Sequence, residues 1–278
     1  MSARYASIKK IGLAAAMMTA VGIGGWSAPA RADINDIYAS NNSIEFRVGG
    51  HHLQYRETVN SQTLDTENGW MPSIGGGVSF LMRKRPNSIW NNVYARLDTQ
   101  FAFGNTDYDG SLQPSGMPYR NTTKSQINDI NFKAGYAFPL GGMAMVIPYA
   151  EFGYHYWLRE MTGVYGYTEH YDHTSIMAGA LLQYSPFSRW IYSLSVQGGT
   201  TMSPQMRTGG VDYDLSERAA WATEGRVSYA VTARTEVFGV AGYNEFSYGK
   251  SAVQTSGSYE PDSKTREVKT FVGVAYRF

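Results

Sequence analysis

The last thirteen residues, 266–278, alternate between two kinds of side chain, and this pattern constrains the fold more than any other. The even-numbered residues from Val268 to Phe278 are apolar except for Thr270. The odd-numbered residues are charged or small, and Phe271 alone breaks the rule. Because successive side chains of a β-strand point to opposite faces, the segment predicts a strand with one apolar and one wet face. A soluble protein rarely ends on such a strand without a polar tail.

The same alternation recurs along the chain and predicts ten strands. Proline, asparagine and glycine residues between the segments, such as Pro139 and Gly141, favour chain reversals. The ninth segment is mixed on both faces and gives the weakest pattern, so eight or twelve strands would also fit. The predicted strands cover residues 43–55, 74–82, 93–103, 129–138, 150–159, 176–184, 192–197, 221–229, 236–248 and 266–278.

The N-terminal segment has the features of a secretory signal peptide. A short apolar stretch, residues 11–25, follows basic residues, and Ala30 and Ala32 supply the small-x-small pattern of a cleavage site. The alternative is a membrane anchor, but the stretch is shorter than the roughly 20 residues that a spanning helix needs. We therefore expect a signal peptide at 1–32 and a single mature domain at 33–278. Residues 33–42 are polar and predict a short lead-in.

Charge and composition exclude several classes of function. The chain has a formal net charge of +1, but the predicted signal holds four of its 24 basic residues and none of its 23 acidic ones. The mature chain is thus slightly acidic, which gives no reason to expect a nucleic-acid partner. Cysteine is absent, so no disulfide can stabilise the fold. The 21 tyrosines fit the aromatic girdles that line both interfaces of a membrane barrel.

The C-terminal strand, with Tyr276 two residues before Phe278, resembles the closing strand of Gram-negative bacterial outer-membrane β-barrels. That resemblance implies an outer-membrane location, contact with lipid and lipopolysaccharide, and recognition of Tyr276 and Phe278 by the barrel-assembly machinery. It extends in general pattern to the outer-membrane protein A and X-like group and to ten-stranded adhesin-like barrels. We therefore predict an all-β, antiparallel up-and-down transmembrane barrel. A soluble β-sandwich would also alternate, but it would not require the signal peptide and this ending together.

The connections between the predicted strands alternate in length. Those after the second, fourth, sixth and eighth strands are short, and the first of them has a turn near residues 85–87. Outer-membrane barrels have short periplasmic turns and long external loops, so this rhythm would place both termini in the periplasm. The longer, polar connections are predicted at 57–70, 105–124, 160–173, 202–217 and 249–264.

The inward positions of the predicted strands carry nearly balanced charge. A barrel of about ten strands is only slightly wider than one whose side chains fill its interior, so unpaired charges there would be costly. We therefore predict an ion-paired, largely plugged lumen, although a thin water-filled passage also fits. The residues predicted to line it are Glu45, Arg47, Arg96, Asp98, Asp129, Lys133, Glu151, Arg159, Glu224, Arg226, Glu267, Lys269 and Arg277.

Two acidic motifs in the predicted external loops suggest one candidate chemistry. Asp107-Tyr108-Asp109 and Asp212-Tyr213-Asp214 resemble the acidic pairs of the omptins, outer-membrane proteases that activate water with an Asp pair facing an Asp-His pair. The chain departs from that family, because Asp214 stands where the histidine is needed. His173 in the third loop is at best a displaced substitute. The simpler interpretation is that these acids are solvated loop residues or bridge cations to lipopolysaccharide phosphates.

The remaining histidines suggest no site of their own. His170, Asp172 and His173 lack a third ligand-bearing motif, so we predict no metal and no cofactor. On the inward face, His155 is expected to hydrogen-bond Glu151. With no catalytic residue predicted, the preferred function is a non-enzymatic, adhesin-like surface barrel whose loops contact host or extracellular ligands. A narrow porin and an omptin-like surface protease are the alternatives.

Overall fold

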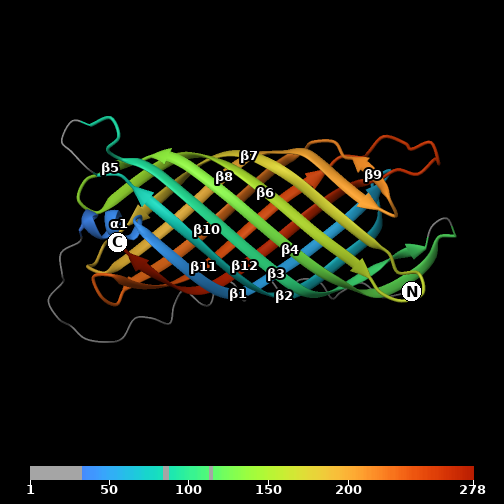
Figure 1. Ribbon diagram of the computed structural model, residues 1–278, viewed down its shortest axis with the longest axis horizontal. Coiled ribbons are helices and arrows are strands. Elements are labelled where there is room, and N and C mark those ends of the chain that lie inside the picture. Colours follow the sequence, from blue (N-terminus) through green and yellow to red (C-terminus); the bar gives the residue numbers. More distant parts are fainter. Residues whose placement is uncertain (1–32, 84–87, 113–114) are drawn as a thin grey trace, which may run out of the picture. The chain divides into compact units, whose positions relative to one another are not determined.

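The computed structural model describes residues 33–83, 88–112 and 115–278, and within them the chain forms a closed antiparallel β-barrel (Figure 1). The predicted signal peptide, including Ala30 and Ala32, lies outside the described residues, as does the turn at 85–87. The prediction of ten long strands is confirmed. They are β1 (Ser43–Val59), β2 (Gln62–Leu81), β3 (Val93–Leu112), β4 (Met117–Tyr136), β6 (Ala144–Met161), β7 (Thr168–Tyr184), β8 (Trp190–Thr208), β10 (Ala219–Ala230), β11 (Thr235–Tyr248) and β12 (Asp262–Arg277).

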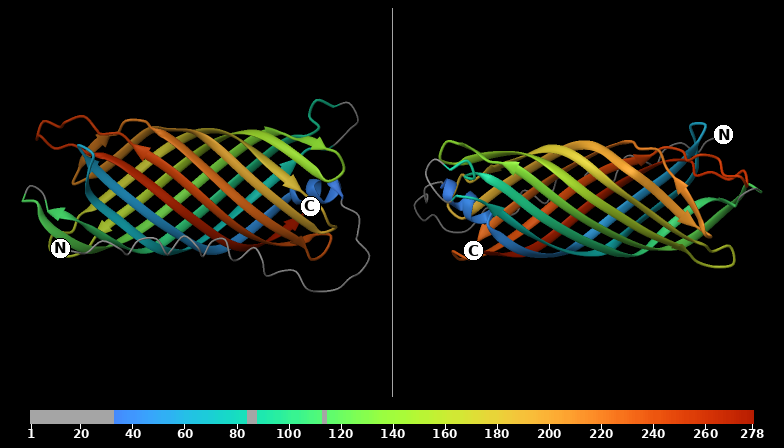
Figure 2. Two further views of the ribbon diagram at one scale, coloured as in Figure 1. Left: turned by 180° about the vertical axis from the view of Figure 1, so that it is seen from behind. Right: turned by 45° about the horizontal axis from the view of Figure 1, so that its top comes forward.

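Each long strand pairs with its neighbours in the chain, and β1 pairs with β12 to close the ring. Two short strands lie beside longer ones: β5 (Phe138–Leu140) pairs with β6, and β9 (Val211–Asp214) pairs with β8. The strands cross the barrel obliquely (Figure 2). We call the end that holds the helix α1 (Ile34–Ser40) the helix end and the opposite end the far end.

The outer face of the barrel is apolar toward the helix end and polar toward the far end. On β1, the outward residues Ile44, Phe46 and Val48 are exposed, whereas Gln54 and Arg56 occupy the outward positions farther along. The strands β2, β3 and β4 are 20 residues long, about twice the 9–11 residues that a tilted strand needs to cross a bilayer. The far part of the barrel wall therefore extends beyond the lipid-facing belt.

The structure confirms the long connection predicted at 249–264, where no strand lies between Tyr248 and Asp262, but most of the other long connections are wrong. Strands continue through most of 57–70 and 105–124, and β1 meets β2 in a two-residue turn at Asn60 and Ser61. Both turn residues have positive φ, as a tight hairpin that follows the twist of its strands requires. The short turn expected after the second strand is also wrong, because residues 82–92 separate β2 from β3 at the helix end. Hairpins outside the lipid need no apolar face, so they lack the alternation that identifies a strand.

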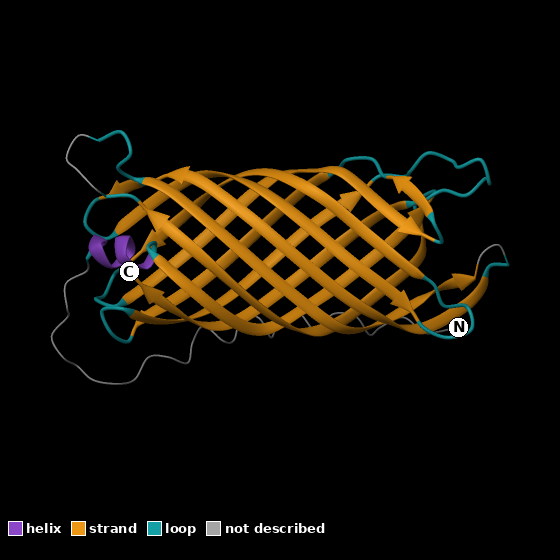
Figure 3. Ribbon diagram, in the orientation of Figure 1, coloured by secondary structure: helices purple, strands orange, loops and turns teal. Residues whose placement is uncertain are grey.

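The predicted lead-in is instead the helix α1, which lies at the helix end of the barrel (Figure 3). Asp33 caps it by accepting a hydrogen bond from the Asn35 backbone N–H at 2.8 Å. Ile37 is fully buried on the inner side of the helix. No helix among the described residues has the length and hydropathy needed to span a bilayer. The apolar cluster around Ile37 comprises Leu81, Tyr94, Ala137, Met145, Ile147 and Ile191.

Phe271, the exception in the alternating C-terminal strand, faces the interior. Its ring lies under the guanidinium of Arg47, with 5.2 Å between the guanidinium carbon and the ring centroid. Gly49 is paired directly with Phe271 across the β1–β12 ladder. A Cβ on Gly49 would lie 1.9 Å from the Thr270 backbone oxygen and 2.8 Å from the Phe271 ring, so only glycine fits beside this strand. The inward face therefore accepts an aromatic residue because it packs below a cation.

Candidate functional site

The interior of the barrel is lined by successive layers of buried side chains. Along β1, inward residues pass from Glu45 and Arg47 through His51 to Leu53 and finally Glu57. From the helix end to the far end, two charged layers are thus followed by one apolar layer and then by a third charged layer. The apolar layer contains, among others, Leu53, Tyr55, Met71, Ile127, Trp157, Tyr171 and Phe246.

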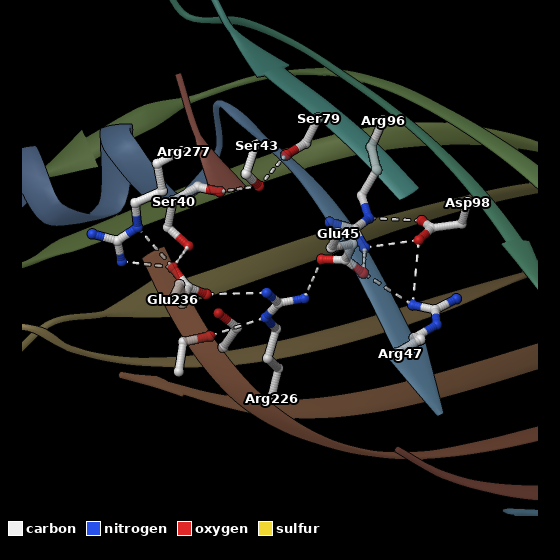
Figure 4. Close-up of polar contacts among 12 residues, drawn as sticks. Ser40, Ser43, Glu45, Arg47, Ser79, Arg96, Asp98, Arg226, Glu236 and Arg277 are labelled. Atoms are coloured by element: carbon white, nitrogen blue, oxygen red, sulfur yellow. Dashed lines mark hydrogen bonds and ion pairs between the residues drawn. The ribbon is translucent and has the colours of Figure 1, made fainter. Parts of the chain in front are cut away.

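Glu45 is the hub of the charged layer nearest the helix end (Figure 4). One carboxylate oxygen lies 2.7 Å from Arg96 Nη2 and 3.3 Å from Arg47 Nη1. The other lies 2.6 Å from Arg226 Nη1. Asp98 adds a second carboxylate, 2.7 Å from Arg96 Nε. Three guanidinium groups and two carboxylates thus share one enclosed network, which satisfies charges that would be costly alone.

Glu236 extends this network to the seam of the barrel and to the helix. Its carboxylate lies 3.0 Å from Arg226 and 2.6 Å from Arg277, and it accepts a hydrogen bond from the Ser40 hydroxyl at 2.9 Å (Figure 4). The sequence analysis missed Glu236 because the ninth strand was mixed on both faces. Its position between two predicted lumen arginines appears only when β10, β11 and β12 are paired.

The middle of the lumen holds a second charged layer. Asp129 lies 2.7 Å from His155 Nδ1 and 2.8 Å from Lys269 Nζ, and Lys269 also contacts Glu267 at 3.2 Å. The expected His155–Glu151 hydrogen bond is wrong. Four residues along one strand are about 13 Å apart, whereas His155 sits directly opposite Asp129 on the neighbouring strand.

Glu151 bonds instead with its own cross-strand neighbour, Lys133, at 3.3 Å. Glu224 makes no ion pair in the described part of the chain and faces a cavity of about 120 Å³ in the middle of the lumen. A smaller cavity of about 40 Å³ lies toward the helix end. These spaces are polar and have room for a few water molecules.

Arg159 organises a third charged layer at the far end. Its guanidinium lies 2.5 Å from Glu67 and 2.5 Å from Glu169, and its side chain is 1% exposed. Further buried carboxyl groups surround it, and the sequence analysis missed them because their segments were predicted as loops. The alternation Asp65-x-Glu67 continues the inward phase of β2 and is the signal that could have found them. The missed acids are Glu57, Asp65, Glu67, Glu169 and Glu260.

The two Asp-Tyr-Asp motifs point their acids away from the lumen. Asp107 and Asp109 are exposed on β3 while Tyr108 between them is buried, and the same holds for Asp212, Tyr213 and Asp214 on β9. Each motif lies on a strand, where neighbouring side chains must face opposite ways. The motifs therefore present their carboxylates on the outer surface of the far-end rim.

The candidate group His170, Asp172 and His173 is likewise divided between the two faces of β7. His173 faces inward and its Nδ1 lies 2.7 Å from the Tyr248 hydroxyl, whereas His170 and Asp172 face outward. His170 bonds Tyr156 at 2.7 Å, and Asp172 accepts from Arg207 at 2.6 Å. Among the described residues, no group of three or more histidine or acidic side chains has an arrangement that could hold a metal ion.

Tyr276 and Phe278, the residues predicted to be read during assembly, lie on the outside of the barrel. The Phe278 ring packs against Phe80 at 5.3 Å between centroids, and its backbone N–H bonds the Asn42 carbonyl at 3.0 Å. Phe278 nevertheless keeps 59% of its surface exposed. Its recognition by the assembly machinery stays a prediction.

The far end also carries a group of apolar and tyrosine side chains, all exposed except the half-buried Tyr119, which we call the tip patch: Met117, Tyr119, Val164, Tyr165 and Tyr167. Val164 is 95% exposed and Tyr165 is 57% exposed. The patch joins two hairpins, since the rings of Tyr119 and Tyr165 lie 5.9 Å apart, edge to face. These residues lie at the far end, away from the lipid-facing belt.

Comparisons with known proteins identify the fold. No family model matches the chain, and no curated protein matches it either. The chain is similar to the outer-membrane protease OmpT from Escherichia coli, with a TM-score of 0.57, 8% identity, and coverage of 86% of this chain and 98% of that one. The transport unit of the autotransporter AIDA-I from Escherichia coli is more distant, with a TM-score of 0.44, 10% identity, and coverage of 85% and 90%. The chain therefore has the fold of a ten-stranded outer-membrane β-barrel.

Proposed function

We propose that this protein is a non-catalytic outer-membrane barrel that contacts extracellular ligands through its far-end tips while its interior stays closed. The observation that carries this proposal is the tip patch, whose most exposed member, Val164, is covered by no other part of the described chain. Exposed apolar and tyrosine side chains gathered in one place mark interaction sites, because leaving them in water is unfavourable. The partners of the barrel are then lipid and lipopolysaccharide around the belt and a surface ligand at the tips.

The filled lumen supports a closed barrel over a narrow porin. A solute entering from the helix end would meet α1, then the Glu45 network and then the layer around Asp129. A lumen lined by charges of both signs, most of them held in ion pairs, offers no continuous path for an ion.

The orientation of the acids supports a non-catalytic role. An omptin-like reaction needs two carboxylates and an Asp-His pair facing one substrate, and here Asp107 and Asp212 lie on the outer surface while His173 lies inside. The likeness to OmpT is a likeness of fold, and activity depends on the site rather than on the fold.

Loss of the tip patch is expected to weaken surface contact. Bacterial cells that display the wild-type barrel should adhere to at least one of three coated surfaces, namely heparin, collagen or fibronectin. The double variant Val164→Ser/Tyr165→Ser should lower that adhesion at least about fivefold, since each lost anchor of an interface typically costs 1 kcal/mol or more. The matched control is Val253→Ser, another exposed valine at the far end. Equal adhesion of the double variant and wild type would refute the tip patch as the contact site.

The closed interior has its own test in planar lipid bilayers. The purified barrel is expected to give no reproducible single-channel steps at moderate voltage, because the layers around Glu45, Asp129 and Arg159 fill the lumen. Regular steps of one size, seen in repeated insertions of wild-type protein, would favour the narrow porin.

A further inference from the structure

The loop formed by residues 249–261, between β11 and β12, is fastened at the far end of the barrel (Figure 2). Its base turns inward, so that Ser251 and Glu260 are buried, and the Glu260 backbone N–H bonds the Ser251 hydroxyl at 2.8 Å. Its outer part is tied to β9, because the Ser258 hydroxyl lies 3.0 Å from that of Tyr213. The Glu260 side chain is therefore the part of this loop that enters the mouth of the barrel.

Glu260 enters a chamber that holds far more acid than base. With Glu57 from β1, Asp65 and Glu67 from β2 and Glu169 from β7, it makes five carboxyl groups, each 6% exposed or less. Within the described residues, Arg159 is the one cation in ion-pair contact with any of them. Five buried carboxylates with one guanidinium would carry a large uncompensated charge, which a protein interior does not tolerate.

The contacts divide these five groups into two classes. Arg159 bonds Glu67 and Glu169 directly, whereas it stays 3.9 Å from Glu57. Tyrosine hydroxyls donate hydrogen bonds to the carboxyl groups that the Arg159 guanidinium does not bond. A hydroxyl is neutral, so it cannot balance the negative charge of an ionised carboxylate. These pairs are Tyr55 with Glu57 at 2.8 Å, Tyr108 with Asp65 at 3.2 Å and Tyr171 with Glu260 at 2.7 Å.

Protonation resolves the excess of acid. Burial, together with the neighbouring Glu169 carboxylate, raises the pKa of Glu260 to about 8. Burial and the adjacent Glu260 raise the pKa of Glu57 well above its usual range, and burial raises that of Asp65. In the described structure, Asp65 Oδ1 accepts no hydrogen bond. A buried oxygen without a donor is less costly on a neutral carboxyl group than on a carboxylate.

We propose that a proton on Glu260 latches the 249–261 loop over the far end, and that losing this proton as external pH rises releases the loop. Release would expose the acidic chamber and change the surface that the far end presents. This inference does not depend on the tip patch or on the ligand it binds. The charged and titratable groups that act on Glu260 are Tyr55 and Glu57 on β1, Asp65 on β2, Arg159 on β6, and Glu169 and Tyr171 on β7. Glu67 on β2 and Tyr108 on β3 complete the chamber through their bonds with Arg159 and Asp65.

The direction of the pH effect follows from linkage. Closing the loop raises the pKa of Glu260 from its ordinary value of 4.5 to about 8, so the closed form binds a proton that the open form has lost. This contribution to closure is fully present below the ordinary pKa and is lost as pH rises through about 8. Because each unit of difference is a tenfold change in population, the ratio of closed to open loop should fall more than about a hundredfold across this window.

Pulsed electron resonance can measure the position of the loop in the full-length barrel in lipid vesicles. The chain contains no cysteine, so Ser256→Cys in the loop and Thr122→Cys on the exposed rim of β4 can carry the only two nitroxide labels. The distance distribution between the labels should be narrow at pH 5 and broad at pH 9. An unchanged distribution from pH 5 to pH 9 overturns the proposal.

Three substitutions separate a proton latch from a merely structural contact. Glu260→Gln keeps the shape of the side chain without its titration, so the distribution should stay narrow at every pH. Glu169→Gln removes the anion that raises the pKa of Glu260 and frees Arg159 to pair with it, so the loop should also stay closed at pH 9. A structural role alone would instead loosen the loop in both variants.

The matched control is Glu245→Gln, an acid outside the chamber that bonds Lys264 and Arg266 on the outer face. Its carboxyl pKa is lowered to about 2, by those two basic side chains acting against burial, so it does not titrate near pH 8. This variant should keep the wild-type transition. A transition that survives Glu260→Gln with an unchanged midpoint, or one that disappears in Glu245→Gln, overturns the assignment to Glu260.

Discussion

Replacing Arg159 by methionine is expected to lower the free energy of unfolding by about 3–5 kcal/mol, because removing one partner of a buried ion pair leaves the other charged and unpaired. The Arg159 side chain is 1% exposed and bonds both Glu67 and Glu169 at 2.5 Å. Methionine fills much of the same space, so the loss reports the charge rather than a cavity. Urea unfolding of the barrel in detergent micelles, followed by tryptophan fluorescence, measures the effect.

The matched control is Arg207→Met. Arg207 also makes a short ion pair, 2.6 Å to Asp172, but its side chain is 46% exposed. A pair screened by water contributes about 1 kcal/mol or less, so this variant should unfold close to wild type. Equal destabilisation by the two variants would show that the chamber is not a buried ion-pair site.

Ile37→Asp is expected to release the helix α1 from the helix end of the barrel. The substitution removes a fully buried side chain worth about 2–3 kcal/mol and puts a carboxylate into an apolar cluster. A loss of that size raises the exposed fraction of the end about 30- to 150-fold. Met145→Cys, a buried reporter in the same cluster, should then react with a water-soluble thiol reagent faster by a similar factor.

Asn35→Asp serves as the control for this experiment, because it places the same new charge on the exposed side of the helix. It should leave the rate at the reporter unchanged. Polar contacts also hold the helix region, among them those from Tyr38 to Asn92, from Ser40 to Glu236 and from Asn41 to Gln183. If polar contacts alone close the helix end, Met145→Cys will react no faster in Ile37→Asp than in the wild-type background, and the closure will not depend on apolar burial.

The sequence by itself determined the barrel, the number of long strands and the inward phase of the charges near the lipid-facing belt. These follow from an alternation with a period of two, which each strand carries locally wherever one face meets lipid and the other meets the lumen. Val268 and Tyr276 already define the outward face of β12, and Glu267 and Arg277 its inward face. The signal disappears where a hairpin leaves the lipid, which is why the outer parts of β1, β2 and β3 were predicted as loops.

Only the tertiary structure decided which charges meet, what closes the two ends and where the acidic motifs point. Asp129 meets His155 because of the register between β4 and β6, and Glu236 meets Arg277 because β11 lies beside β12. Periodicity assigns a face but not a neighbour. Five acids from β1, β2, β7 and a distant loop surround Arg159 only after the wall has closed into a ring. Contacts across a barrel join residues far apart in the chain, and their energies depend on burial that no local pattern encodes.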